Sequence, residues 1–355
     1  MTWNVRGLND RRKARLVAAY VKCHKVDICM LQETHLVASS LGRMKAGWVG
    51  ECHCSVYSSY ARGVAILLRK GLQWRTRRVI VDPSGRYVMM SGTLLDRACW
   101  LVAVYGPNAD DPEFFRELWH MVELLGSGAV LWGGDFNVVL DSRMDRKSAA
   151  TVQHGAAARA LVDLWRCRHG AAREGTCVNY THSSWSRIDR WLGTRDVEGW
   201  TSSVDHLPCT LSDHSPVRLV LEVPSELGHA FLWRLPCGVL RDVTFRAEVR
   251  EAIVSFFAEN EGSVGAASTL WEAFKVVIRG VCLSKQHGML RTLRRELADL
   301  EGRIQELERR LVESWSGEVL AELRVWCLCM RRPLSERFVS WAGTHACEYA
   351  AQAMG

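Results

Sequence analysis

The sequence lacks the features of a membrane or secreted protein. It contains no run of about 18 uncharged apolar residues, which excludes a typical membrane-spanning helix. The first residues, MTWNVRGLNDRRKAR, contain no apolar core of the kind that a signal peptide has. We therefore expect an intracellular protein, in the nucleus, the cytoplasm or both, that makes no contact with a membrane.

Paired cysteine motifs are also missing. The 13 cysteines form no CxxC pair. Cys52 with Cys54, and Cys327 with Cys329, are the closest pairs, and neither has a second pair at the spacing of a zinc site. We interpret the cysteines as ordinary free thiols.

A strong charge imbalance is absent as well. The net charge is +7, and all of the excess lies in residues 1–224, which hold 29 Lys and Arg against 22 Asp and Glu. Residues 225–355 are neutral, with 17 of each sign. This mild basic excess suits a polyanionic partner such as nucleic acid but does not identify one.

Short apolar segments bounded by Gly, Pro, Asn or Asp alternate with amphipathic stretches up to about residue 224. Strands are predicted at 26–34, 63–70, 99–107, 128–137, 187–194 and 215–223. Helices are predicted at 11–22, 111–125 and 153–168. Strands that are apolar on both faces, with helices between them, indicate an α/β or α+β domain.

The composition shifts near residues 223–229, and helical periodicity dominates a second domain at 225–355. Helices are predicted at 242–259 and 270–281. From Leu290 to Leu311 apolar residues recur at alternating spacings of three and four, which predicts a heptad helix at about 287–314. This seam serves either self-association as a coiled coil or packing within the chain. Its short length slightly favours packing within the chain.

Polar side chains recur where predicted strands end, and the segment LWGGDFNVVLD at 131–141 is the clearest case. Strand alternation would place Asp135 and Asn137 on one face and Phe136 on the other. Gly133 and Gly134 would allow a close approach of backbones. Other strand-end candidates are Asn4, Glu33, Tyr105, Asn108, Asp189, Asp213 and His214. Each alone is explained by a turn, a cap or an ion pair, but together they suit metal-assisted hydrolysis of a phosphate ester.

Six segments in this order resemble the exonuclease–endonuclease–phosphatase superfamily: WNVRGLN, LQETHL, VYGPN, GGDFNVVLD, SRIDRWL and LSDHSPV. QETHL and SRID narrow the resemblance to the apurinic-like endonuclease domain that opens the second open reading frame of LINE-type non-LTR retrotransposons. The resemblance covers about residues 1–222. It implies a four-layer α/β sandwich of two packed mixed sheets flanked by helices, followed here by a C-terminal helical extension.

The resemblance also implies an activity, a Mg²⁺-dependent nick in DNA, with Mn²⁺ as a substitute. Glu33 would be the principal metal ligand, assisted by Asn4, and Asp213 would lie near the metal. The product 3′-hydroxyl would prime reverse transcription. Element RNA would then be a further partner, through a polymerase region of which this sequence has no acidic motif.

Five residues would carry out the chemistry if the resemblance holds. Asp135 would position or deprotonate the attacking water, and Asn137 would hold the phosphate. His214 would contact the scissile phosphate, with Asp189 fixing its ring and favouring its protonated form. Tyr105 would donate a hydrogen bond to the phosphate or to developing charge.

DNA contacts would extend beyond this centre. Asn108 would support the DNA backbone. Basic residues in the segments that follow Asn4 and the GDFN strand would reach neighbouring phosphates or form a solvated basic face: Arg11, Arg12, Lys13, Arg143, Arg146 and Lys147.

Two departures from the family pattern leave other functions open. Only three residues precede Asn4, so we expect a strand that frays, a poorly positioned Asn4 and weak activity. The segment between NYTH (Asn179–His182) and SRID is short, at a place where the family often has a DNA-probing hairpin, so target selectivity is expected to differ or be lost. A phosphatase or abasic-site repair nuclease of the same fold is one alternative. The other is a decayed, inactive fragment that only binds nucleic acid or self-associates.

Overall fold

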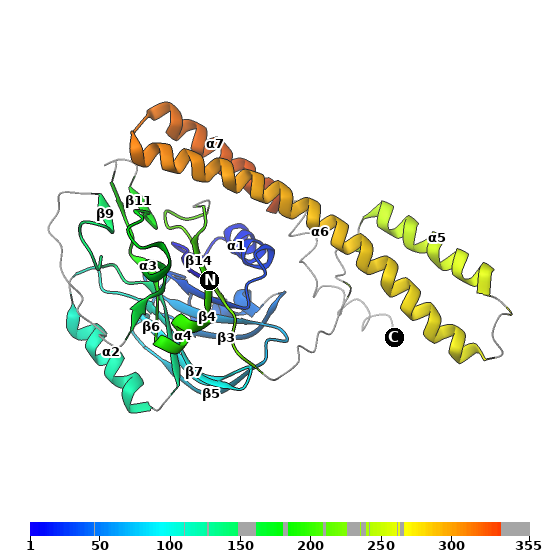
Figure 1. Ribbon diagram of the computed structural model, residues 1–355, viewed down its shortest axis with the longest axis horizontal. Helices are drawn as coiled ribbons and strands as arrows, with labels where there is room; N and C mark the ends of the chain where they lie inside the picture. Colours follow the sequence, from blue (N-terminus) through cyan, green and yellow to red (C-terminus); the bar gives the residue numbers. More distant parts are fainter. Residues whose placement is uncertain are drawn as a thin grey trace.

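Within the residues that it describes, the computed structural model contains two six-stranded sheets packed face to face, followed by three helices (Figure 1). It describes residues 1–45, 47–109, 111–125, 128–147, 161–179, 184–208, 211–225, 235, 239–240, 242–260, 262 and 266–334.

The first sheet has the strand order β14-β15-β1-β2-β4-β3. β1 and β2 are parallel neighbours and the other pairs are antiparallel, so the sheet is mixed. The strand bounds are β1 Thr2–Asn4, β2 Ile28–Gln32, β3 Val49–Ser55, β4 Val64–Arg69, β14 Thr201–His206 and β15 Val217–Leu221.

The second sheet has the order β10-β13-β8-β7-β6-β5, with β7 and β8 parallel. The strand bounds are β5 Trp74–Val81, β6 Tyr87–Leu94, β7 Arg97–Tyr105, β8 Ala129–Asp135, β10 Val162–Asp163 and β13 Asp189–Gly193. A separate small sheet contains β11 Cys177–Asn179, β12 Ser184–Ser186 and β9 Arg146–Lys147.

Alternation along each strand creates the layers. In β2, Met30 packs between the two sheets, whereas Cys29 and Leu31 face α1 Arg11–Cys23. In β6, Met90 packs between the sheets and Met89 faces α2 Pro112–Leu125. Because both faces of each sheet are apolar, both are covered. The predicted four-layer sandwich with a C-terminal helical extension is confirmed.

The remaining elements are short or follow the sandwich. They are η1 Ala38–Lys45, α3 Leu164–His169, α4 Arg195–Trp200, α5 Val243–Asn260, α6 Ala267–Glu313 and α7 Gly317–Pro333. None of the helices in the described ranges is long and apolar enough to cross a membrane.

Some predicted elements differ from the structure. Within the described residues the helix predicted at 153–168 is confirmed only from Leu164, where α3 begins, because Val162–Asp163 form β10 against β13. Asp163 accepts a hydrogen bond from the Arg166 backbone N at 3.1 Å and so caps that helix. The earlier part of that prediction, 153–160, lies outside the described residues.

The structure also differs from the sequence predictions in α6 and at residues 146–147. The helices predicted at 270–281 and from Leu290 onward are one continuous helix, α6, because no proline interrupts the stretch between them. Arg146 and Lys147, expected in a loop, form β9 and pair with β12.

The heptad seam of α6 is buried within the chain. Leu297, Ile304 and Leu307 are at most 3% exposed and belong to the same apolar cluster as Val17 and Tyr20 of α1. Figure 1 shows α7 running back along α6, beside the sandwich. Where α6 meets the end of α1, His24 Nε2 lies 2.9 Å from Glu301 Oε1. Of the two roles for the seam, the structure supports packing within the chain, and self-association through it stays a prediction.

Substitution of Ile304 tests this packing. Ile304 is 0% exposed, so Ile304→Ala is expected to lower the free energy of unfolding by about 2–5 kcal/mol. Leu328→Ala in α7 is the control, because Leu328 is 61% exposed and a change of about 0.5 kcal/mol or less is expected. Chemical denaturation of the full chain measures both. A stable Ile304→Ala protein would contradict the packing of α6 against the sandwich.

Candidate active site

Three candidate residues form a row across one end of the second sheet. In the register of the strands Tyr105 at the end of β7 lies opposite Asp135 at the end of β8, and Asp135 lies opposite Asp189 at the start of β13. Asp135 and Asp189 are at most 1% exposed. The backbones of β8 and β7 approach closely at Gly134, as predicted. A Cβ on Gly134 would lie 1.9 Å from the Val104 carbonyl oxygen. The strand pairing therefore brings together residues that are far apart in the sequence.

The first sheet contributes Asn4, which ends β1, and Glu33, which directly follows β2. The Asn4 side-chain Nδ2 donates to Glu33 Oε1 at 3.0 Å and to Asp135 Oδ2 at 2.8 Å. This amide therefore links the two sheets and separates two carboxylates that would otherwise repel each other.

The expectation of a fraying first strand is wrong. β1 pairs with β15 on one side and β2 on the other, and Asn4 is 1% exposed. Trp3 is fully buried and donates from its indole Nε1 to the His214 carbonyl oxygen at 2.9 Å. Pairing on both sides and a buried tryptophan hold this three-residue strand in place.

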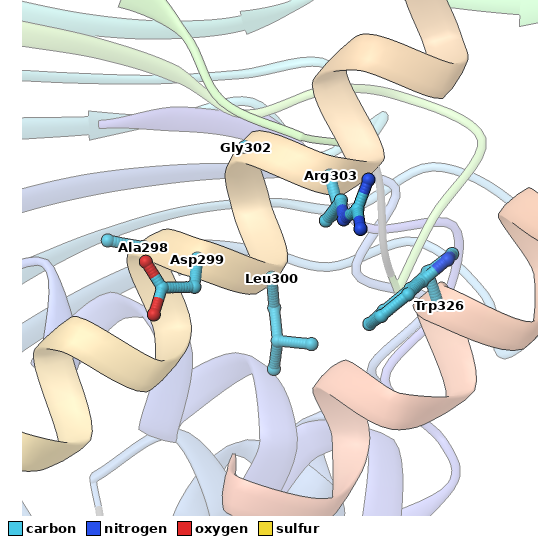
Figure 2. Close-up of a pocket in the computed structure, with 6 residues that line it drawn as sticks. All are labelled: Ala298, Asp299, Leu300, Gly302, Arg303 and Trp326. Carbon is cyan, nitrogen blue, oxygen red and sulfur yellow. The ribbon is translucent and has the colours of Figure 1, made fainter.

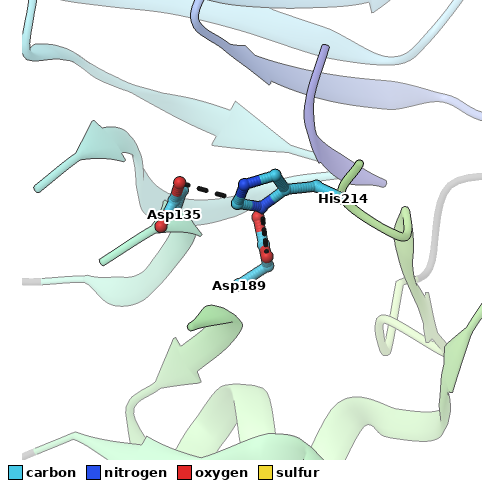
Figure 3. Close-up of side chains that lie close together, drawn as sticks. All are labelled: Asp135, Asp189 and His214. Atoms are coloured by element: carbon cyan, nitrogen blue, oxygen red, sulfur yellow. Dashed lines mark hydrogen bonds and ion pairs between the residues drawn. The ribbon is translucent and has the colours of Figure 1, made fainter. Parts of the chain in front are cut away.

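His214 lies between the two aspartates (Figure 3). Its Nδ1 donates to Asp189 Oδ2 at 2.8 Å and lies 3.8 Å from Asp135 Oδ2. Burial acts to lower the pKa of His214, but the charge and hydrogen bond of Asp189 outweigh it and hold this pKa well above its usual value. The imidazole is therefore favoured in its cationic form.

The pKa of Asp135 is raised as well. Burial, and then the charge of Asp189, raise the pKa of Asp135 to about 6. A carboxylate with a pKa near neutrality is ionised at pH 7 and is also basic enough to accept a proton. Burial, and then the charge of Glu33, raise the pKa of Tyr105, which keeps its phenol protonated as a donor.

Hydrogen bonds connect Asp135 through Asn137 and Asn108 to the Tyr105 hydroxyl. The Asn137 backbone N donates to Asp135 Oδ1 at 2.9 Å, and the Asn137 side-chain Nδ2 donates to Asn108 Oδ1 at 3.2 Å. Asn108 Oδ1 also accepts from the Tyr105 hydroxyl at 3.3 Å. Phe136 packs against Phe115 of α2, with ring centroids 5.8 Å apart. The expected separation of Phe136 from the polar pair is present.

Strained backbone is found at two of these positions. Glu33 has a φ of 49° and Asn137 a φ of 55°. Both lie in the left-handed region that residues other than glycine seldom adopt. Asn137 therefore approaches Asp135 through a turn after β8, not through strand alternation as expected. Such strain persists only where the surroundings impose it, and it is concentrated at functional sites.

Metal-binding groups occur at two places in the site. Ligand atoms of Asp135, Asp189 and His214 lie within 4.8 Å of one another, but His214 Nδ1 is already hydrogen-bonded to Asp189. Glu33 is more accessible, with its side chain 21% exposed, and offers the hard carboxylate oxygens that Mg²⁺ prefers. In the buried cluster, Asp189 Oδ1 has no hydrogen-bond partner. The Glu33 carboxylate therefore fits a divalent cation, and it lies beside the cluster of Asp135, Asp189 and His214.

The other predicted residues lie around this centre. Asp213 forms an ion pair with Arg6 at 2.6 Å, and both side chains are partly exposed. Asn4 presents its Nδ2 to Glu33, and its Oδ1 accepts from the Arg6 backbone N at 3.0 Å. The structure therefore does not place the Asn4 or Asp213 oxygens against Glu33.

The predicted basic residues lie on two sides of the site. Arg11 and Arg12 begin α1 and are exposed, while Lys13 Nζ donates to the Arg6 carbonyl oxygen at 2.9 Å. Arg143 lies in the turn after β8, and Arg146 and Lys147 form β9. The small sheet of β9 adjoins the site, because Cys177 of β11 forms a β-bridge with His214.

A buried ionic network that the sequence pattern did not predict adjoins Asp189 in the chain. Arg187 Nε and Nη2 donate to the two carboxylate oxygens of Asp145 at 2.9 and 3.0 Å, and Nη2 also donates to Asp163 at 2.7 Å. Arg190 lies 3.5 Å from Asp145. The signal in the sequence is the SRIDR segment, in which arginines lie close to Asp189 on both sides. The arginines on either side of Asp189 form the ion pairs, which leaves Asp189 to bind His214.

A separate hollow of about 490 Å³ lies between α6 and α7 (Figure 2). It is open and is lined by Ala298, Asp299, Leu300, Gly302, Arg303 and Trp326. None of these residues belongs to the candidate active site.

Comparison with known proteins identifies a related transposon-encoded sequence. The chain is 26% identical over 322 residues to the Transposon TX1 uncharacterized 149 kDa protein of Xenopus laevis, which covers 87% of this chain and 24% of that protein. The chain thus spans about a quarter of this curated relative's length. The expected relation to a transposon-encoded protein is confirmed.

Similar solved structures have the same fold. The catalytic domain of Xenopus laevis APE2 superposes with a TM-score of 0.53 at 19% identity, covering 64% of this chain and 93% of that one. The AP endonuclease LMAP of Leishmania major gives a TM-score of 0.52 at 19% identity, covering 63% and 87%.

The sequence profile of the Endonuclease/Exonuclease/phosphatase family matches residues 1–214, which contain the whole row of strand-end residues and its buried trio. On this match, and on a fold and site that agree with it, the chain belongs to the endonuclease/exonuclease/phosphatase family.

Proposed function

We propose that this chain is a Mg²⁺-dependent DNA endonuclease of retrotransposon origin. The observation that carries the proposal is the contact between the two sheets, where Asn4 joins Glu33 to Asp135 and Asp189 holds His214. The transposon-encoded relative supports the origin, and the AP endonucleases among similar structures support DNA as the substrate.

In this proposal the reaction is hydrolysis of one phosphodiester bond. Asp135, with its pKa near 6, accepts a proton from the attacking water. The water oxygen bonds to phosphorus, the bond from phosphorus to the 3′ oxygen breaks, and that oxygen takes up a proton from solvent. The nick leaves a 3′-hydroxyl, which suits target-primed reverse transcription.

The phosphate would be held by donors on either side of Asp135. Cationic His214, oriented by Asp189 at 2.8 Å, offsets charge that builds up on the phosphate oxygens. The amide of Asn137 and the hydroxyl of Tyr105 already converge on Asn108 Oδ1, which places these donors together. Amides and hydroxyls orient a phosphate without adding negative charge.

Glu33 would hold the divalent cation. Asn4 or Asp213 would add an oxygen ligand only by giving up its present hydrogen bond, from the Arg6 backbone N to Asn4 Oδ1 or from Arg6 Nη1 to Asp213 Oδ2. When bound, the cation neutralises phosphate charge and stabilises the attacking and leaving oxygens. The Asn4 amide keeps Glu33 and Asp135 apart through its two hydrogen bonds, so that these carboxylates act separately. Arg143, Arg146, Lys147 and the start of α1 would contact neighbouring DNA phosphates.

A plasmid assay tests the function. The purified chain is expected to convert supercoiled plasmid to the nicked circle in Mg²⁺, and EDTA is expected to abolish this. Glu33→Gln and His214→Ala should each lower the nicking rate by at least about 10²-fold, because each removes a charge that the transition state uses. Asp96→Asn, an exposed substitution outside the site, is the control.

Each alternative makes a different prediction in the same assay. Nicking that survives both site substitutions would contradict the proposed centre. Strong preference for an abasic lesion, or faster release of phosphate from small esters, would favour a repair nuclease or phosphatase. No nicking by the parent, with salt-sensitive DNA binding retained, would indicate a decayed nuclease.

A further inference from the structure

The loop between β3 and β4 presents an aromatic side chain to solvent. In the part of the chain that the structure describes, Tyr60 is the most exposed large apolar side chain, at 89%, and Tyr57 of the same loop is 54% exposed. A single exposed ring is common on protein surfaces and needs no special explanation. What distinguishes this loop is how firmly its backbone is held and what lies beside it.

The backbone around Tyr60 is fixed by hydrogen bonds. Ser58 Oγ accepts from the backbone N of Tyr60 at 3.3 Å and of Ala61 at 3.0 Å. Asn9 Nδ2, from the segment that follows β1, donates to the Ser59 carbonyl oxygen at 2.6 Å. A ring carried on a fixed backbone loses little conformational entropy when it binds a partner.

The loop is joined directly to the candidate active site. The Arg62 carbonyl oxygen accepts from the His35 backbone N, and the Gly63 carbonyl oxygen accepts from the Thr34 backbone N, each at 3.0 Å. Thr34 and His35 directly follow Glu33. A ligand that reaches Glu33 therefore lies beside this loop.

Two arginines make this side of the site basic. The Arg62 guanidinium lies 4.6 Å from the centre of the Tyr57 ring and donates to the Ser84 carbonyl oxygen at 3.1 Å. Arg86 lies 5.7 Å from the centre of the Tyr105 ring and donates to the Gly106 carbonyl oxygen at 2.9 Å. We name Tyr57, Tyr60, Arg62 and Arg86 the aromatic rim.

We propose that the aromatic rim binds an unpaired nucleotide beside the cleaved bond, with the Tyr60 ring stacked on its base and Arg62 facing its phosphate. Alternating aromatic and cationic side chains are the chemistry that recognises single-stranded nucleic acid. In an intact duplex the base faces are covered by their neighbours, so an exposed ring gains a base face only where the strand is open. The rim therefore favours DNA that is locally unpaired at the cut. This inference rests on the proposed function for the position of the DNA.

Binding measured without cleavage tests the rim independently of activity. Fluorescence anisotropy in EDTA would compare a fully paired duplex with one that contains a short unpaired stretch. Tyr60→Ala is expected to weaken binding of the opened duplex by about 5- to 150-fold, the equivalent of about 1–3 kcal/mol of stacking. Binding of the paired duplex should change by less than about two-fold, and Tyr60→Phe should keep the parent's preference because it keeps the ring.

Matched controls separate a loss of stacking in Tyr60→Ala from a loss of folded protein. Trp315→Ala removes a half-exposed ring, 53% exposed, in the turn between α6 and α7, and should leave both affinities unchanged. The free energy of unfolding of Tyr60→Ala should equal that of the parent, since the ring is exposed. Equal weakening of both duplexes, or no weakening, would overturn the inference even if the parent nicks DNA. A parent that binds as described but never nicks would overturn the proposed function alone.

Discussion

Asp135→Asn is expected to lower the nicking rate by about 10²–10⁴-fold while leaving the protein folded. The substitution removes the proton acceptor and retains one oxygen, which can accept from the Asn4 side chain or from the Asn137 backbone N, because these two donate to different oxygens of Asp135. Burial and the neighbouring Asp189 make ionisation of Asp135 unfavourable, as its pKa of about 6 shows. An ionised Asp135 therefore costs stability at neutral pH, and the neutral amide should not lower the free energy of unfolding.

Two measurements on the same preparation test this. Single-turnover nicking gives the rate of the chemical step, and chemical denaturation gives the free energy of unfolding. A nicking rate within about three-fold of the parent would exclude Asp135 as the base, since general-base catalysis contributes about 10²–10⁴-fold. A loss of activity together with a clear loss of stability would assign Asp135 a structural role instead.

Asp145→Asn is expected to lower the free energy of unfolding by about 3–5 kcal/mol. Asp145 is 1% exposed and accepts hydrogen bonds from Arg166 and from both donor atoms of the Arg187 fork. Removing its charge leaves buried Arg187 with Asp163 alone and leaves Arg190 without its nearer carboxylate. Breaking one side of a buried ion pair is costly because the remaining charge stays buried.

An exposed ion pair provides the control. Asp27 contacts Arg69 at 2.5 Å, but both side chains are about half exposed, so Asp27→Asn should cost about 0–1 kcal/mol. Similar losses in the two variants would contradict the special role of the buried network.

The stabilisation from Asp145 should also depend on pH in a defined direction. Burial acts to raise the pKa of Asp145, but the hydrogen bonds and charge of Arg187 outweigh it and hold the pKa below its usual value. The stabilisation is complete above the unfolded pKa of about 3.9 and is lost as pH falls through the folded value. Below about pH 4 the parent should therefore lose stability more steeply than Asp145→Asn.

Much of the candidate site was predictable because it consists of strand ends. The predicted strands at 26–34, 99–107 and 128–137 correspond to β2, β7 and β8. Glu33, Tyr105 and Asp135 lie at or next to the ends of these strands, and parallel pairing places such ends at one edge. Turn chemistry was less predictable. Asn137 reaches Asp135 through a left-handed residue, a conformation that strand alternation does not indicate.

Partner choice among charged residues was not predictable. The segment SRIDR contains Asp189 between two arginines, and local sequence favours an ion pair among them. In the structure β13 pairs with β8, which places Asp189 beside His214, while Arg187 and Arg190 turn to Asp145. These contacts join residues about 25 and 42 positions apart, and no local pattern specifies them.

The sequence by itself determined the order of apolar strands, the polar residue at the end of each and the amphipathic seam of α6, because each follows from periodicity over a few neighbouring residues. Only the tertiary structure decided that Asn4 joins Glu33 to Asp135, that Asp189 holds His214 and that the seam of α6 is buried on α1 and α7. The physical reason is that each of these contacts depends on the pairing of two sheets or on the docking of a distant helix, and burial then fixes which polar groups meet.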